Sequence, residues 1–165
     1  MFHVPVLSGD TALFYSELRA QLEALIGDER DAVANLANAA ALIWHTTPEL
    51  NWAGFYLCRQ GNELVLGPFQ GKPACVRIAV GKGVCGTAVA RGESVLVEDV
   101  EAFPGHIACD GASRSELVVP IRQEGRVVGV LDLDSPRVGR FTDADRVGFE
   151  GVVAVLERVG LDSVL

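Results

Sequence analysis

The spacing of apolar residues changes from a helical period to a strand period at Pro48. Before this proline, apolar side chains recur every three to four residues over 10–26, which predicts a helix that Asp10 can cap. An alanine-rich run predicts a second helix as far as about His45. After the proline, residues 51–58 alternate between two faces, as a half-buried strand does. The chain therefore combines helices with a sheet.

The remaining elements complete this pattern. Asp28, followed three residues later by Asp31, resembles a capping arrangement for the second helix, and Thr142 with Asp145 predicts a capping box for a last helix to about residue 159. A short helix is expected near Val84–Thr87, and the segment 99–115 shows no period, which is typical of a functional loop. Further strands are expected over 63–69, 75–80, 94–98, 116–122 and 126–134. We therefore predict a single α+β domain over 1–165, with an antiparallel sheet of about six strands that packs against N-terminal helices and a C-terminal helix.

Charge and hydropathy exclude several classes of protein. The chain has 22 acidic and 14 basic residues, for a formal net charge of −8, without a basic cluster that would serve nucleic acid or an anionic membrane surface. Residues 1–7 lack the basic stretch and apolar core of a signal peptide, and the uncharged run 32–48 is too short and too polar to span a bilayer. We therefore expect a cytoplasmic protein with no nucleic-acid or membrane partner.

Three of the four cysteines lie where reactive groups are common. Cys75 is at the end of a predicted strand, Cys85 at the start of a predicted helix whose dipole favours the thiolate, and Cys109 in the long loop. Their spacing lacks a Cys-x-x-Cys pair, so we expect no structural zinc site. The alternative is that each is a small buried hydrophobe, which is our interpretation of Cys58 on the first strand.

Three acids are expected to converge at one end of the sheet. Alternation places Asp132 and Asp134 on the same face of their strand, and Glu116 opens the neighbouring strand of the hairpin. In a partly dry pocket these carboxylates repel one another, so at least one pKa is expected to rise. Such a site suits an ammonium ligand and one protonated carboxyl group that acts as an acid. The alternative is that Asp132 and Asp134 only end the strand and lead into a turn.

Two aromatic residues are candidates for a binding surface. Trp52 and Tyr56 share a strand face with Gly54 between them, which leaves a gap of side-chain size that would suit a methyl or sulfonium-like group. Ordinary core packing is the alternative interpretation.

The glycine-rich turn Gly81–Gly86 lacks the spacings of phosphate-binding loops. Its amides, or those of the loop around Cys109, remain candidates for a substrate carboxylate. His3, His45 and His106 are too scattered in the sequence to predict a metal site.

The order of elements, with the strand Gly129–Leu131, resembles the GAF domain, which binds small ligands. A more specific resemblance spans nearly the whole chain and is to the free methionine-(R)-sulfoxide reductase family. It rests on residues 51–56, 67–75, 81–86, 106–110, 113–121 and 129–135.

The resemblance implies a thiol mechanism. Cys109 matches the catalytic cysteine, which attacks the sulfoxide sulfur and becomes a sulfenic acid when free methionine leaves. Cys75 matches the resolving cysteine, and Cys85 a second one that can also pair, so the resting disulfide is either Cys75–Cys109 or Cys85–Cys109. Thioredoxin as the reductant, a homodimer, and the absence of any metal or organic cofactor are implied in the same way.

The resemblance also implies the substrate contacts. Glu116, Asp132 and Asp134 match the acids around the amino group and the sulfoxide oxygen of free L-methionine-(R)-sulfoxide, and Trp52 and Tyr56 match the aromatic side of the pocket. Two other classes remain open: a GAF sensor that binds a ligand without chemistry, and a general thiol peroxidase or a repair enzyme for peptide sulfoxides.

Overall fold

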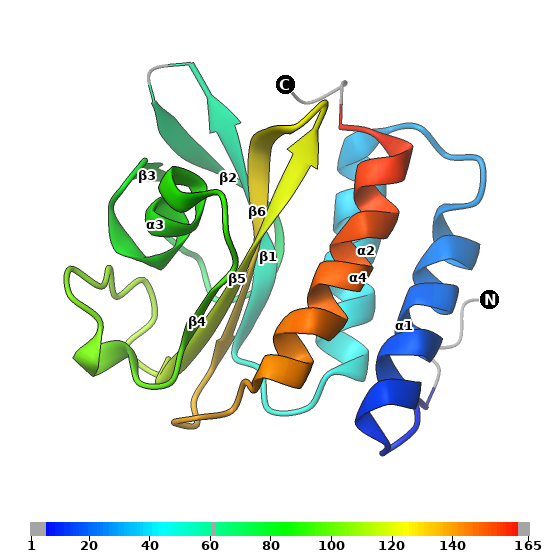
Figure 1. Cartoon of the computed structure of the whole chain (residues 1–165), viewed down its shortest axis with the longest axis horizontal. Helices are drawn as coiled ribbons and strands as arrows, with labels where there is room; N and C mark the ends of the chain where they lie inside the picture. Colours follow the sequence, from blue (N-terminus) through cyan, green and yellow to red (C-terminus); the bar gives the residue numbers. More distant parts are fainter. Residues whose placement is uncertain (1–5, 61, 162–165) are drawn as a thin grey trace.

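A sheet with helices on one side and a less regular layer on the other makes up the computed structural model, which describes residues 6–60 and 62–161 (Figure 1). The helices are α1 (Thr11–Ile26), α2 (Ala32–Thr46), α3 (Gly83–Arg91) and α4 (Asp143–Val159). The strands are β1 (Trp52–Arg59), β2 (Glu63–Gly71), β3 (Arg77–Ala79), β4 (Val95–Val97), β5 (Ser115–Gln123) and β6 (Arg126–Ser135). The long loop expected over 99–115 is present, apart from one short 3-10 helix, η1 (Val100–Ala102).

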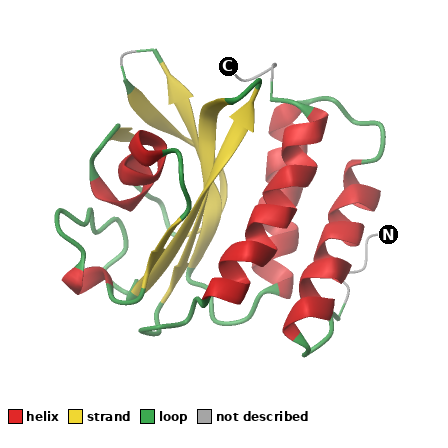
Figure 2. Cartoon of the chain, in the orientation of Figure 1, coloured by secondary structure: helices red, strands yellow, loops and turns green. Residues whose placement is uncertain are grey.

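The strands form one antiparallel sheet in the order β3-β2-β1-β6-β5-β4. Strands β1, β6 and β5 lie side by side at its centre, and α3 lies on the opposite side of the sheet from α2 and α4 (Figure 2). The predicted α+β class, a six-stranded antiparallel sheet with N-terminal helices and a C-terminal helix packed on it, is confirmed.

Some of the expectations fall outside the described residues. Residues 1–5, in which we expected no signal peptide, lie outside the described residues. Gly61, in the expected turn between the first two strands, also lies outside them. Among the residues that are described, no helix combines the length and the apolar character needed to cross a lipid bilayer.

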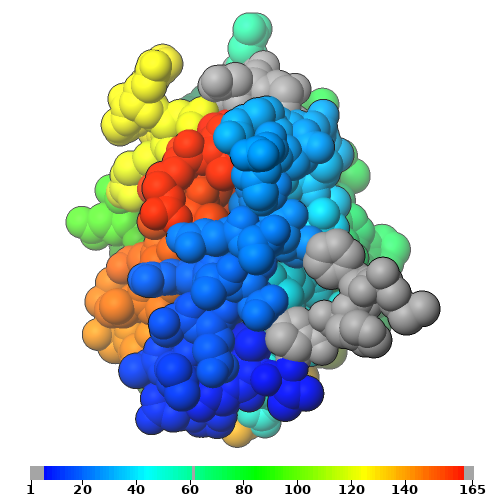
Figure 3. Space-filling view, turned by 90° about the vertical axis from the view of Figure 1, so that its right-hand side faces the viewer, coloured from blue at the N-terminus to red at the C-terminus, as the bar shows by residue number. Residues whose placement is uncertain are grey.

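Alternation along the central strands separates two apolar cores. Phe55, Leu117 and Leu131 face α2 and α4, which in turn carry α1. Figure 3, viewed from this side, shows α1 outermost across the helical face. Tyr56 and Val118 face the other way, into a second core with α3. The alternate positions of β5 and β6 therefore point towards α3, and these include the three acids singled out above.

Two predicted helix caps are correct and one is wrong. Asp10 caps α1 and accepts a hydrogen bond from the backbone N–H of Leu13. Thr142 and Asp145 form the expected capping box at the start of α4. The cap of α2 is Asp31, which accepts a hydrogen bond from the backbone N–H of Ala34, and not Asp28. A capping carboxylate must stand directly before the first helical turn to reach its free N–H groups, and Asp28 lies too far upstream.

Candidate functional site

A small cavity of about 40 Å³ lies on the α3 side of the sheet, opposite the main helical layer. It is bounded by the floor of the sheet, the start of α3, the connection before β3 and the loop that precedes β5. Seven of the eight predicted site residues line it, and the eighth, Cys75, lies just behind the wall and is bonded to one of them. The seven are Trp52, Tyr56, Cys85, Cys109, Glu116, Asp132 and Asp134.

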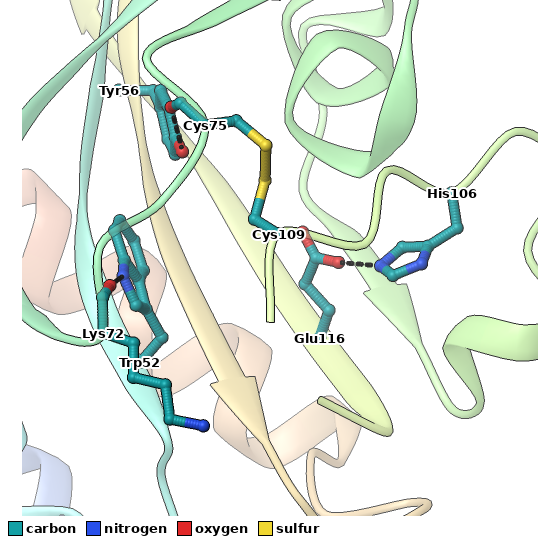
Figure 4. Close-up of a disulfide and its surroundings, with 7 residues drawn as sticks. All are labelled: Trp52, Tyr56, Lys72, Cys75, His106, Cys109 and Glu116. Carbon is teal, nitrogen blue, oxygen red and sulfur yellow. Dashed lines mark hydrogen bonds and ion pairs between the residues drawn. A yellow bond between two sulfur atoms is a disulfide. The ribbon is translucent and has the colours of Figure 1, made fainter. Parts of the chain in front are cut away.

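A disulfide between Cys75 and Cys109 closes the site (Figure 4). Their Cα atoms are 5.7 Å apart, within the usual range for such a bond. Of the two pairings left open by the sequence, the structure therefore has Cys75–Cys109, while Cys58 and Cys85 are free. Cys75 stands in the connection before β3, and not in the strand where it was expected, because β3 begins only at Arg77.

The two aromatic residues of β1 fix the segment that carries Cys75. The Tyr56 hydroxyl donates a hydrogen bond of 2.8 Å to the carbonyl oxygen of Cys75, and Trp52 Nε1 donates one of 3.1 Å to the carbonyl of Lys72 (Figure 4). Burial, and then the charge of Asp132, raises the pKa of Tyr56, so this hydroxyl stays protonated and keeps donating. The segment that carries Cys75 is thus attached to the sheet by two side chains of β1.

The expected gap between the rings of Trp52 and Tyr56 is wrong. The two rings stack with centroids 5.8 Å apart, and Phe69 of β2 stacks on the other side of Trp52 at 5.2 Å. A Cβ atom at Gly54 would lie 2.3 Å from that of Phe69 and 2.8 Å from the indole. The space above Gly54 is therefore filled by neighbouring side chains, and the rings form a wall of the cavity instead of a slot.

The loop that carries Cys109 is attached to the sheet on its other side. Asn51 Nδ2 donates hydrogen bonds to Asp110 Oδ2 at 3.2 Å and to Ser113 Oγ at 3.0 Å. The backbone N–H of Ala112 donates to Asp110 Oδ1 at 3.0 Å, and this bond is the main reason that the pKa of Asp110 is lowered. Asp110 is therefore a charged anchor of the loop next to Cys109.

The three acids meet as their strands predict. In the sheet, Glu116 is paired with Asp134, and Asp132 lies one alternate position further along β6. Glu116 and Asp132 are buried, and Asp134 is partly buried. Burial raises the pKa of all three, and the charges of neighbouring acids raise each of them further. Burial and the repulsion of neighbouring acids therefore favour a proton on Glu116 or Asp132.

Comparisons with known proteins decide the family. The model of the GAF domain matches residues 21–159. Protein YtsP of Bacillus subtilis is 56% identical over 159 residues, which cover 96% of this chain and 98% of that protein. Free methionine-R-sulfoxide reductase of Escherichia coli is 53% identical over 146 residues, 88% of either protein. The X-ray structure of free methionine-R-sulfoxide reductase from Neisseria meningitidis in complex with its substrate has a TM-score of 0.93 and 44% identity, and covers 99% of this chain and 97% of that one.

The chain belongs to the free methionine-R-sulfoxide reductase family, a family of oxidoreductases with the GAF fold. In this reductase, sequence reasoning missed three residues that build the site, namely Asn51, Phe69 and Ser113. Asn51 opens the predicted strand 51–58 and Ser113 lies near the end of the predicted loop 99–115, so both occupied positions where anchoring side chains are common.

His106 also lies in the reductase site, although its position in the sequence predicted no ligand role. Its Nε2 atom is 3.4 Å from Glu116 Oε2, and it lines the cavity (Figure 4). Burial lowers the pKa of His106 and raises that of Glu116, so both groups favour their neutral forms. We therefore treat the pair as a polar contact between the loop and the sheet, and not as a strong ion pair.

The expected activation of Cys85 by the dipole of its helix is wrong. Cys85 is in the first turn of α3, as predicted, but it is buried and its thiol donates a hydrogen bond to Asp132. Burial, followed by the charges of Asp132 and Glu116, raises the pKa of this thiol well above its ordinary value. Desolvation among acids therefore outweighs the helix dipole, and Cys85 is held as a thiol in this reductase.

The acid cluster predicts a pH-dependent gain in stability when one carboxyl group is removed. The pKa of Glu116 is higher in the folded protein than in the unfolded chain. Its contribution to stability is therefore fully present below its pKa in the unfolded chain, and it is lost as the pH rises through its pKa in the folded protein. We expect Glu116→Gln to raise the free energy of unfolding at pH 8 by about 1 kcal/mol, or roughly 2–4 °C in Tm, and to have less effect at pH 5.

Thermal unfolding of the disulfide form, followed by circular dichroism in chelator-treated buffer at both pH values, measures this difference. Glu93→Gln removes an exposed carboxyl group and is the matched control, for which we expect a change of under about 0.5 kcal/mol. A gain for Glu116→Gln that is equal at pH 5 and pH 8 would contradict the expected coupling.

Proposed function

We propose that this chain reduces free L-methionine-(R)-sulfoxide to L-methionine, with Cys109 as the nucleophile and Cys75 as the resolving thiol. The observation that carries the proposal is the Cys75–Cys109 disulfide, placed over a cavity whose floor holds three acids of raised pKa. A bare ligand-binding module needs the cavity and the acids but has no use for a pair of thiols that bridge beside them. The relatives that share the family name support the same reaction.

The chemistry follows from the groups at the site. The thiolate of Cys109 attacks the sulfoxide sulfur, and the oxygen takes protons as its bond to sulfur weakens. As the substrate's S–O bond breaks, the oxygen transfers to the Cys109 sulfur, so that methionine leaves and Cys109 carries the oxygen as a sulfenic acid. The thiol of Cys75 then attacks the Cys109 sulfur, water leaves, and the disulfide forms. One sulfoxide and two thiols become one sulfide, one disulfide and one water, so two electrons pass from the cysteines to the substrate.

A proton kept on Glu116 or Asp132 by the raised pKa of these acids is the source we assign for protonation of the sulfoxide oxygen. A carboxyl group kept neutral near neutral pH is a competent acid at that pH. Asp134, which is paired with Glu116 across the sheet, completes the set that faces the substrate's ammonium group. An ammonium among these acids offsets their repulsion, whereas the uncharged amide of a peptide leaves it in place, and this favours the free amino acid.

The size of the cavity indicates that the loop must move during turnover. About 40 Å³ holds only a few water molecules, because one water needs roughly 10–15 Å³ by this measure, and methionine sulfoxide is far larger. Ile107 packs against Gly83 at the start of α3, with 3.1 Å between its Cδ1 atom and a Cβ built on the glycine. We propose that reduction of the disulfide frees the segment around Ile107 and Cys109 and opens the site to substrate.

The remaining parts of the proposal concern context. We propose a single GAF-like domain over 1–165 that works as a homodimer in the cytoplasm. Thioredoxin is the proposed reductant, because the reaction leaves a disulfide that a cytoplasmic dithiol must reduce in each cycle. The reaction as written uses only thiols and carboxyl groups of this chain.

Single turnover with resolved substrates tests the proposal. The reduced protein, freed of excess reductant, is mixed with the R or S epimer of free methionine sulfoxide, with a peptide sulfoxide, or with hydrogen peroxide. We expect one methionine formed and two thiols lost per chain with the free R epimer, and rates at least about 100-fold lower with the other three. Tight binding of the free sulfoxide without loss of thiols would support the sensor instead, and equal rates with peroxide or the peptide would support a general peroxidase or a peptide repair enzyme.

A further inference from the structure

Three buried donor groups of different chemistry meet beneath the disulfide. The sulfur of Cys85 and one carboxylate oxygen each of Glu116 and Asp132 all lie within 4.8 Å of one another. All three side chains are buried. They come from α3, β5 and β6, so the cluster is held by packed regular elements and not by a flexible loop.

One atom of this cluster is left without a partner. Asp132 is 6% exposed, and its Oδ1 atom accepts no hydrogen bond from the residues that the structure describes. A buried carboxylate oxygen without a donor costs on the order of 1–3 kcal/mol, so such an atom usually marks a place for a ligand. Asp132 lines the cavity, and a ligand there would therefore meet this oxygen.

A fourth donor stands at the edge of the cluster. His106 Nε2 is 3.4 Å from Glu116 Oε2 and also lines the cavity. In a tetrahedral zinc site with bonds of about 2.0–2.3 Å, neighbouring donor atoms are roughly 3.3–3.7 Å apart. The distance between these two atoms already fits that edge. The donor atoms of Cys85, Glu116 and Asp132 lie within 4.8 Å of one another and need to close by up to about 1 Å to reach it.

We propose that the disulfide form of this protein binds one thiophilic divalent cation of the Zn²⁺ class through Cys85, Glu116 and Asp132, with His106 as the fourth ligand. The mixture of one thiolate, two carboxylates and one imidazole suits Zn²⁺ or Cd²⁺ and disfavours Mg²⁺ and Ca²⁺, which prefer oxygen ligands alone. The cavity of about 40 Å³ admits an ion while it excludes the amino-acid substrate.

Such a cation would act as an inhibitor and not as a cofactor. It would occupy the acids that the proposed function assigns to the substrate's ammonium group, so this consequence rests on that function, although the binding itself does not. It would also hold Cys85 and, through His106, the loop that carries Cys109. The bound metal is therefore expected to keep the site closed and to compete with the sulfoxide.

Titration of the full chain in its disulfide form with Cd²⁺ tests the binding. In this form Cys75 and Cys109 are blocked, and the thiols left to bind are Cys58 and Cys85. We expect one Cd²⁺ per chain and an ultraviolet charge-transfer band from a cadmium-bound thiolate. Cys85→Ser should abolish the band and weaken Zn²⁺ binding, measured by calorimetry, by at least about 10-fold. Cys58→Ser is the matched control and should keep both signals.

A second variant keeps the test independent of changes in the core. His106→Ala alters a partly exposed loop residue, and we expect it to weaken Zn²⁺ by about 10-fold while the cadmium band persists. No band at one equivalent of Cd²⁺ in the wild type, or a band that survives Cys85→Ser and is lost in Cys58→Ser, overturns the proposal.

Activity measured with and without a chelator separates this proposal from the proposed function. If the site and the reaction are both as described, micromolar Zn²⁺ raises the KM for the free sulfoxide and the chelator restores it. If Cd²⁺ binds as expected but the chelated protein makes no methionine, the proposed function fails and the metal site stands. If the chelated protein is active and Cd²⁺ gives no band, the metal site fails alone.

Discussion

Replacing Cys109 with serine is expected to lower the rate of methionine formation by at least about 1,000-fold, even in a single turnover of the reduced protein freed of excess reductant. The reaction needs a soft nucleophile at the sulfoxide sulfur, and a serine hydroxyl is a weak nucleophile that remains protonated. Cys109 is the thiol that both lines the cavity and bonds to Cys75. Serine keeps nearly the same volume, so loss of activity would report on the sulfur and not on the packing of the loop.

The measurement is methionine formed per chain, with the R epimer of the free sulfoxide, after the protein has been fully reduced. Cys58→Ser is the matched control, because Cys58 is a free and half-buried thiol of β1 outside the cavity, and we expect its activity to be unchanged. The oxidised Cys109→Ser protein should also have one more free thiol than the wild type, since Cys75 loses its partner. A variant that still formed one methionine per chain would assign the nucleophile to Cys85 or Cys75.

The sheet and its faces could be predicted because strand alternation is a local property. Each residue of a strand points to the opposite face from its neighbour, so Asp132 and Asp134 had to share a face once the strand was found. The antiparallel hairpin brings Glu116 to the same end of the sheet, and a shift of register between Ile121 and Arg122, which the sequence does not mark, sets it directly opposite Asp134. The capping box of α4 was predictable for the same reason, because Thr142 and Asp145 are three residues apart.

Features that depend on distant parts of the chain could not be predicted in this way. The gap expected above Gly54 is filled by Phe69, which reaches it from β2 through a local shift of register near Gly54. Asn51 holds Asp110 and Ser113 across 59 and 62 residues, and no periodic pattern marks such pairs.

The protonation of Cys85 required the structure for a physical reason. The helix dipole at its position is visible in the sequence and favours a thiolate. Complete burial beside Asp132 and Glu116 acts in the opposite direction and is stronger, because removing a thiolate from water among carboxylates costs more than one helix terminus returns. Burial is a sum over many distant contacts, so the net direction appears only when α3 is seen packed on β5 and β6.

Replacing Cys75 with serine is expected to leave the first turnover intact and to lower steady-state turnover with thioredoxin by about 100-fold. The nucleophile and the acids remain in this variant, so one methionine per chain should appear at the wild-type rate. The sulfenic acid on Cys109 then lacks the thiol that stands at bridging distance, with a Cα separation of 5.7 Å. Labelling with a reagent specific for sulfenic acids should therefore capture Cys109 in this variant and not in the wild type.

Cys85 is the thiol that could replace Cys75 in resolving the sulfenic acid, and we expect it to react slowly. Burial among the acids raises the pKa of its thiol, so little of the attacking thiolate is present, whereas Cys75 already lies at bridging distance from Cys109 and its carbonyl oxygen accepts a hydrogen bond from Tyr56. The double variant Cys75→Ser with Cys85→Ser measures this difference directly. If the single variant recycles fully with thioredoxin and only the double variant stops after one methionine, the resolving role belongs to Cys85. If both stop after one methionine, Cys75 alone resolves the sulfenic acid, as its place beside Cys109 requires.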